Sequence, residues 1–345
     1  MINFQCDYAE GCHPILLEAL TKTNMEQTTS YGCDIYSKNA CAMLRTACGS
    51  EDADVHFLVG GTQTNATVIA SVLRHHQGVV SADSGHIAMH ETGAIEATGH
   101  KILCIPSEDG TISAEQIEAL CHEHFTSPIQ EHMVQPGLVY ISFPTESGTL
   151  YSKAQLTAIK KVCKAYDLPL YIDGARMGYG LVSTACDLTL QDIANLCDVF
   201  YIGGTKCGAL FGEAVVIINE ALKKDFRYAI KQHGGLLAKG RLLGVQFEAL
   251  FENGLYFDIC RQAIEHALAI RKAFEDKGMQ LWGTSYTNQQ FVILTDAQMK
   301  RLTDLGYEYE VWVPSDVGQT VVRFCTSWAT TAENTQRLID DIKAL

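Results

Sequence analysis

Two stretches of the sequence, LPLYIDGAR at 168–176 and VFYIGGTK at 199–206, indicate the fold. Each begins as a short apolar run of the kind that forms a buried strand, and each ends in glycine and charged residues. A helical pattern at 189–196 lies between them, as in one βαβ unit. Because ligands of parallel α/β sheets sit beyond the carboxyl ends of the strands, we expect Asp173 and Lys206 to face one cleft.

The same alternation of apolar runs and amphipathic stretches continues on either side of this unit. Further strands are expected at 55–59, 78–81, 101–105, 138–143 and 214–218, and helices at 65–75, 113–122 and 153–166. Ser113 with Gln116, and Ser152 with Gln155, have the spacing of capping boxes, which mark helix starts. The pattern predicts an α/β fold in which helices cover both faces of a large, mostly parallel sheet.

The pattern changes after Gly254. A long helix is expected at about 257–277, followed by short strands at 290–294 and 321–325 and a closing helix at 331–345. We therefore expect a large domain at 1–250 and a smaller α+β C-terminal domain at 251–345. The N-terminal segment is expected to pack on the small domain.

The composition excludes several classes of protein. The 345 residues include 40 Asp and Glu but only 26 Lys and Arg. The resulting net charge of −14 repels nucleic acid phosphates and anionic membranes. The 13 cysteines are odd in number and contain no CxxC pair, which favours the reducing cytoplasm over a disulfide framework. The first residues lack the features of a secretory signal, and no run of 18 apolar residues could span a membrane. We expect a cytoplasmic protein without nucleic-acid or membrane partners.

Lys206 is the strongest candidate for chemistry. Lysine is rarely buried, and a desolvated lysine amine loses its proton and becomes a nucleophile that forms Schiff bases. The alternative is a lysine on an exposed loop. Asp173 needs a partner at the end of an apolar strand, and a helix cap or Arg176 would supply one without any catalytic role. Gly60-Gly61 follows another expected strand. The pair forms either an anion site at a helix N-terminus or, as the alternative, an ordinary turn between a strand and a helix.

A Schiff-base lysine, an acid and an anion site are what pyridoxal phosphate requires. Around these residues, the chain resembles the threonine aldolase and β-eliminating amino-acid lyase family of fold type I pyridoxal-phosphate enzymes. The resemblance extends over nearly the whole chain. It rests on SGHI and ETG within 84–93, DGAR at 173–176, GTK at 204–206 and VRF at 322–324.

The resemblance implies a role for each matching residue of the cofactor site. Lys206 would bind the cofactor as a Schiff base and act in catalysis, and Asp173 would keep the pyridine nitrogen protonated. His86 would stack on the ring and take part in proton transfer, although a structural histidine is the alternative. Gly61 and Thr62 would bind the phosphate.

Four basic residues complete the implied site. Arg176 would lie near the ring oxygen or the substrate carboxylate. Arg323 would hold that carboxylate with both arms of its guanidinium, the alternative being a surface cation. Because the family builds its sites at a dimer interface, the resemblance also implies a homodimer or homotetramer, in which Lys239 or Arg241 would contact the phosphate from a second subunit.

The chain departs from the family pattern at three places near the expected substrate pocket. Cys6 precedes Asp7 where many family members have serine, and we expect it to contact the substrate. FPTESG at 143–148 replaces a stretch that contains Asn and His in typical threonine aldolases, and His90 stands where tyrosine is usual. These changes affect the predicted substrate rather than the predicted cofactor.

The sequence thus predicts a pyridoxal-phosphate-dependent aldolase that cleaves a β-hydroxy-α-amino acid, of the threonine, allo-threonine or phenylserine type, to glycine and an aldehyde. β-Elimination or racemisation on the same cofactor would break a different bond. Outside this class, the alternatives are a non-catalytic homologue and a dinucleotide-dependent oxidoreductase, which lacks GxGxxG after any expected strand. His122, His124 and His132 lack the spacing of a metal site, and no metal is expected.

Overall fold

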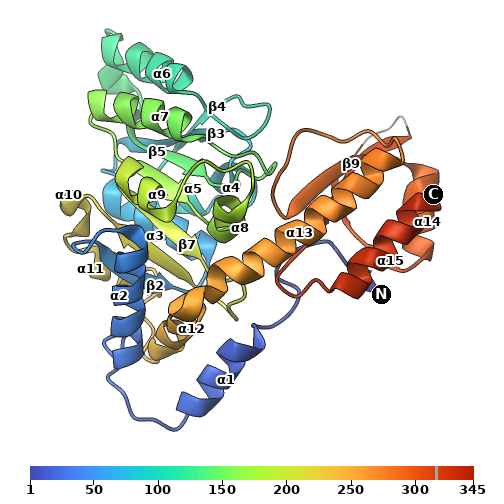
Figure 1. The fold of residues 1–345 in the computed structure, drawn as a ribbon. Helices are drawn as coiled ribbons and strands as arrows, with labels where there is room; N and C mark the ends of the chain where they lie inside the picture. The colour runs from blue at the N-terminus through green and yellow to red at the C-terminus, as the bar shows by residue number, and fades with distance from the viewer. Residues whose placement is uncertain (315–317) are drawn as a thin grey trace.

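A seven-stranded sheet forms the centre of the larger part of the molecule in the computed structural model, which describes residues 1–314 and 318–345 (Figure 1). Strand β8 runs antiparallel to both its neighbours, and the other strands share one direction. All seven expected strands are present, and the predicted α/β fold class is confirmed. In spatial order they are β2 (Asp54–Leu58), β8 (Glu213–Ile217), β7 (Val199–Gly203), β6 (Leu170–Asp173), β5 (Gln135–Ser142), β3 (Gln77–Ala82) and β4 (Ile102–Ile105).

Helices cover both faces of this sheet. Alternate residues of a strand point to opposite faces, so Tyr140 and Ile141 of β5 belong to different hydrophobic clusters. Capping boxes at Ser113 and Ser152 begin two of the helices, as predicted. One face packs against α2 (Ile35–Cys48), α6 (Ala114–Thr126), α7 (Lys153–Ala165), α8 (Met177–Val182), α9 (Leu190–Leu196) and α12 (Arg241–Phe251), and the other against α3 (Gly61–Val72), α4 (His86–Met89), α5 (Ala94–Ala97), α10 (Glu220–Lys223) and α11 (Phe226–Gln232).

Helix α13 (Leu255–Asp276) runs from the large sheet to a second, smaller one (Figure 1). Its apolar residues recur every three or four positions, which places Ile259 against the large core and Ile270 and Phe274 against the small one. No helix in the described part of the chain is long and apolar enough to cross a membrane. The small part contains β9 (Gln289–Thr295), β11 (Glu310–Val313), β12 (Gln319–Cys325), α14 (Asp296–Asp304) and α15 (Ala332–Lys343). The division of the chain at residue 250 stays a prediction.

The N-terminal segment lies against the small sheet. Its first strand, β1 (Ile2–Asn3), pairs in parallel with β10 (Tyr307–Glu308), and Phe4 is buried in the small core. The backbone N–H of Cys325 donates to the Phe4 carbonyl at 2.7 Å. The chain then passes between the two sheets before α1 (Pro14–Thr23) begins. This path brings the residues after Phe4 to the carboxyl edge of the large sheet.

Candidate active site

Two cavities lie at the carboxyl edge of the large sheet. The first has a volume of about 270 Å³ and is lined by Asp173, Lys206, Gly61 and Thr62. The second has a volume of about 210 Å³ and reaches the small sheet, where Arg323 lines it. The cavities share five lining residues: Tyr8, His86, Glu146, Arg176 and Lys206. The structure therefore brings residues from positions as far apart as 8 and 323 into one continuous cleft between the sheets.

Asp173, the last residue of β6, is buried and accepts four hydrogen bonds. Oδ1 accepts from the Tyr201 hydroxyl at 2.5 Å and the Ala175 amide at 3.0 Å. Oδ2 accepts from the Tyr140 hydroxyl at 2.7 Å and the Asn65 amide at 3.0 Å. Burial by itself would raise the pKa of Asp173, but the His86 charge and these donors outweigh it and hold the pKa below its ordinary value. The carboxylate is therefore held ionised inside the protein.

Two of the four donors to Asp173 are tyrosines on the strands that flank β6, Tyr140 on β5 and Tyr201 on β7. Tyr140 on β5 lies directly opposite Tyr171 on β6, and the Tyr171 hydroxyl donates to Asn65 Oδ1 at 2.7 Å. Tyr140, Tyr171 and Tyr201 each precede an isoleucine and then the last residue of their strand. This repeated pattern, which our sequence analysis missed, marks a layer of hydroxyl groups beneath the cleft.

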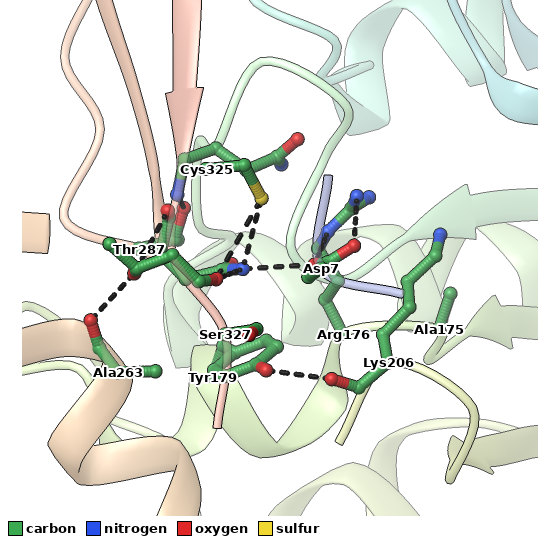
Figure 2. Close-up of polar contacts among 12 residues, drawn as sticks. Asp7, Ala175, Arg176, Tyr179, Lys206, Ala263, Thr287, Cys325 and Ser327 are labelled. Carbon is green, nitrogen blue, oxygen red and sulfur yellow. Dashed lines mark hydrogen bonds and ion pairs between the residues drawn. The ribbon is translucent and has the colours of Figure 1, made fainter. Parts of the chain in front are cut away.

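Lys206 follows β7 after two glycines and is partly buried. The backbones of the two strand ends approach closely here: a Cβ at Gly174 would lie 1.9 Å from the Tyr201 carbonyl oxygen, so only glycine fits. Figure 2 shows Lys206 beside Ala175, with the Tyr179 hydroxyl donating to the Lys206 carbonyl at 2.7 Å. Burial, and then the charge of Arg176, lower the pKa of the Lys206 amine, which favours the neutral, nucleophilic form.

Glu213, the first residue of the antiparallel strand β8, lines the same cavity as Lys206. Its carboxyl group accepts from the Thr205 hydroxyl at 2.8 Å and the Gly204 amide at 3.1 Å. Burial raises the pKa of Glu213 to about 8, so the group is mostly protonated at neutral pH. The cleft thus carries less negative charge than its count of carboxyl groups suggests.

Helix α3 begins at the cleft with Gly61 and Thr62 in its first turn. The residue before it, Gly60, is extended, and no side chain from the described residues caps the helix there. Free amide groups at the start of a helix attract anions. A Cβ at Gly61 would lie 3.1 Å from the Tyr201 hydroxyl, which keeps this turn close to the Asp173 network.

His86 lines both cavities from the start of α4. Its Nδ1 lies 2.8 Å from Glu91 Oε1, which also accepts from Asn65 Nδ2 at 2.7 Å. Since Asn65 donates to Asp173 as well, one buried amide links the carboxylates of Glu91 and Asp173. The pair with Glu91 orients the imidazole ring at the mouth of the cofactor cavity.

Arg176 pairs with Asp7, and its predicted alternative pairing with Asp173 is wrong. Nε and Nη2 donate to the two oxygens of Asp7 at 2.7 and 3.0 Å. Asn288 donates to the same carboxylate at 2.9 Å. Figure 2 shows Asp7 between Arg176 and the small part of the molecule. Despite full burial, the charges of Arg176 and Lys206 lower the pKa of Asp7 to about 2.

Arg323 is buried, so the alternative of a surface cation is wrong. One arm donates to Gln289 at 2.9 Å, and the other donates to the Gln5 carbonyl and to Glu310. The guanidinium carbon also lies 5.1 Å from the centre of the Trp312 ring. The Glu310 side chain, in contrast, is 44% exposed. Gln289, the Gln5 carbonyl and Glu310 therefore hold the guanidinium in place, and of these Glu310 can move into solvent.

Three predicted site residues do not reach the cleft. Cys6 lines neither cavity, whereas Tyr8, two residues later, lines both. Arg241 donates instead to the carbonyls of Asn24 and Glu26, and Lys239, two residues earlier, is exposed. Contact of Lys239 or Arg241 with the phosphate of a second subunit stays a prediction.

The residues present fit pyridoxal phosphate. The open N-terminus of α3 suits a phosphate, the ionised carboxylate of Asp173 suits a protonated pyridine nitrogen, and the amine of Lys206 suits an aldehyde. All three features line the same 270 Å³ cavity. The cavity therefore matches the cofactor in the chemical groups that it offers.

Comparisons with known proteins agree with this chemistry. The chain is 28% identical to the low-specificity L-threonine aldolase of Pseudomonas sp. over 99% of its own length and 97% of that protein. The solved structure of Leishmania major threonine aldolase is 42% identical, covers 100% of this chain and 99% of its own, and superposes with a TM-score of 0.97. Cystalysin from Treponema denticola, whose structure contains pyridoxal 5′-phosphate, shares the fold at 16% identity, with a TM-score of 0.74 and coverage of 100% of this chain and 90% of its own. The sequence profile of the β-eliminating lyase family matches residues 5–297, and the chain belongs to that family.

Proposed function

We propose that the protein is a pyridoxal-phosphate-dependent aldolase that cleaves a β-hydroxy-α-amino acid of the threonine or phenylserine type to glycine and an aldehyde. The observation that carries the proposal is the placement of Lys206, with its lowered pKa, opposite the ionised Asp173 in a cleft that continues to Arg323. The relatives named as threonine aldolases, among them one at 42% identity over the whole chain, support the choice of reaction.

Each part of the cleft has a task in this reaction. When bound, pyridoxal phosphate withdraws electrons from the α-carbon of an amino acid, which weakens the bonds at that carbon. Lys206 would hold the cofactor aldehyde, and the first turn of α3 would bind its phosphate through Gly61 and Thr62. Asp173 would place its negative charge beside the protonated pyridine nitrogen, and this attraction would keep the ring able to accept electrons.

The substrate would enter from the second cavity. Arg323 lines this cavity with a guanidinium group of the kind that binds carboxylates, and the Trp312 ring supports it from one face. His86, oriented by Glu91, lies in the wall that both cavities share and suits stacking on a flat ring. Arg176 is committed to the buried Asp7, so we assign the substrate carboxylate to Arg323.

We further propose that the protein works in the cytoplasm as a homodimer or homotetramer. The 13 cysteines are all unpaired, as a reducing compartment allows. Helix α1 and the turn that follows it expose apolar side chains that a second subunit would cover: Ile15, Leu17, Met25 and Tyr31. Light scattering on the purified protein, compared between wild type and M25E, tests this assembly.

The test of cofactor and reaction uses absorption and product analysis together. Purified protein given pyridoxal phosphate should develop a visible absorption band that borohydride bleaches, and K206A should lack that covalent band and all turnover. Threonine or phenylserine should yield equal amounts of aldehyde and glycine. A keto acid with ammonia would instead indicate β-elimination, and a protein that stays colourless would refute the proposal.

A further inference from the structure

Glu146 follows β5 and lines both cavities, yet half of its carboxyl group has no partner. Oε1 accepts from the Ser142 hydroxyl at 2.7 Å and from the backbone N–H of His86 at 3.1 Å. Oε2 is shielded from solvent and has no hydrogen-bond partner among the described residues. A shielded acceptor without a donor is costly, so the site favours a ligand that brings a hydroxyl group.

Glu146 also lies where the reaction needs a group that exchanges protons. Burial raises its pKa above the ordinary value; the Ser142 hydrogen bond lowers it, Asp173 raises it, and His86 lowers it. The other titratable or charged groups that line the cavities with Glu146 are Tyr8, His90, Arg176, Tyr201, Lys206, Glu213, Glu310 and Arg323. The raised pKa makes the Glu146 carboxylate a better proton acceptor than an ordinary carboxylate, which suits an acid–base role.

His86 keeps only Nε2 for such a proton transfer. Its Nδ1 is held by Glu91, and its place in the shared wall suits stacking. Glu146 stands in the 143–148 stretch, one of the segments in which the sequence departs from the family pattern. The chain therefore carries a second proton-transfer group that the resemblance did not assign.

We propose that Glu146 is the catalytic acid–base residue for the β-hydroxyl group of the substrate, with Oε2 as the proton acceptor. This inference rests on the proposed aldolase function. In the cleavage direction, the O–H bond of the β-hydroxyl breaks and its proton bonds to Oε2. The electron pair of that bond becomes the second C–O bond of the aldehyde as the Cα–Cβ bond breaks. The electron pair of the Cα–Cβ bond stays on Cα, which takes up one proton to become glycine, so protons and electrons balance.

The experiment separates this role from cofactor binding. The E146Q holoenzyme keeps an acceptor for Ser142 and for the His86 amide but cannot take a proton. We expect kcat/KM for cleavage of threonine and phenylserine to fall by about 10²–10⁴-fold. Exchange of the glycine α-proton in D₂O, followed by NMR, involves no β-hydroxyl and should keep its wild-type rate. The exposed carboxylate of Glu96 on α5 supplies the control, and E96Q should behave as wild type.

A pH profile gives a second readout that a structural role would not change. In the wild type, kcat/KM for cleavage should fall at low pH as Glu146 becomes protonated, and E146Q should lose that limb. Because the Ser142 hydrogen bond lowers the pKa of Glu146, S142A should move the limb to higher pH. If E146Q fails to fold, the shift in S142A decides the question.

Three results would overturn the inference. The first is an E146Q protein that cleaves threonine and phenylserine at the wild-type rate. The second is a folded E146Q protein that loses cleavage and glycine α-proton exchange to the same extent. The third is an S142A protein whose kcat/KM falls at the same low pH as that of the wild type. A wild-type protein that releases no aldehyde would instead refute the proposed function, on which the inference depends. The two failures are therefore distinguishable.

Discussion

Asp7 accepts two hydrogen bonds from the guanidinium of Arg176, although the residues lie 169 positions apart in the sequence. The Asp7 carboxylate is fully buried, and Asn288 of the small part donates to the same oxygen as Arg176 Nε. One carboxylate therefore joins the N-terminal segment, the large sheet and the small part of the molecule. This pair fixes the wall between the two cavities.

The first prediction concerns the stability that this pair contributes. Because D7N leaves the buried Arg176 charge uncompensated, we expect it to lower the free energy of unfolding by about 3–5 kcal/mol. Denaturant unfolding of the apoprotein measures the change. The control is D258N, which breaks an exposed pair with Arg261 and should change the stability by less than about 1 kcal/mol. Equal effects of the two substitutions would contradict the role of Asp7.

The pKa of Asp7 adds a prediction about pH. Since folding lowers this pKa from 3.8 to about 2, the stabilising contribution is complete above 3.8 and is lost as pH falls towards 2. The difference in unfolding free energy between wild type and D7N should stay constant from pH 7 to 5. It should shrink as the pH is lowered below about 4. A difference that grows on acidification would show that Asp7 is not held ionised by its neighbours.

Tyr201 carries a prediction about cofactor affinity. Its hydroxyl donates to Asp173 and helps to lower the pKa of that carboxyl group. Removing one hydrogen bond to a charged group costs about 1.5–3 kcal/mol. We therefore expect Y201F to weaken pyridoxal phosphate binding by about one to two orders of magnitude in a fluorescence titration.

A matched control lies on the neighbouring strand. The Tyr171 hydroxyl donates to Asn65 and makes no bond to Asp173, so Y171F should weaken the binding of pyridoxal phosphate much less. Tighter cofactor binding by Y201F would mean that the hydroxyl competes with the pyridine nitrogen for Asp173. That result would contradict the supporting role assigned to Tyr201.

Local sequence patterns predicted most of the fold. The seven strands of the large sheet are short apolar runs bounded by glycine and polar residues, and such signals need no knowledge of distant contacts. The reversed direction of β8 and the pairing of β1 with β10 depend on distant partners, and no local pattern reports them. Strand β1 has only two residues, too few for any period to appear.

The sequence predicts those residues of the candidate site whose positions depend only on where a strand ends. Asp173 and Lys206 end neighbouring parallel strands, so the topology alone brings them to one edge. Asp7 and Glu310 reach the arginines from the N-terminal segment and the small sheet, and their positions depend on how the two parts pack together. The three tyrosines were within reach of the sequence, because each occupies the same position relative to its strand end. Their hydroxyl groups had no predicted role.

Arg323 and Glu310 carry the last prediction, which concerns substrate affinity. We assign the Arg323 guanidinium to the substrate carboxylate, and the Glu310 carboxylate already accepts a hydrogen bond from one of its arms. Glu310 is 44% exposed, so its interaction is screened by water and contributes about 1 kcal/mol at most. E310Q should therefore lower the Kd of the holoenzyme for glycine by up to about fivefold, measured by calorimetry. R323A, which removes the charged donors altogether, should raise that Kd by about 10–100-fold and leave cofactor affinity unchanged. Ethanolamine has the amine but no carboxylate, so its Kd should change in neither variant; a parallel change for both ligands would place the substrate carboxylate elsewhere.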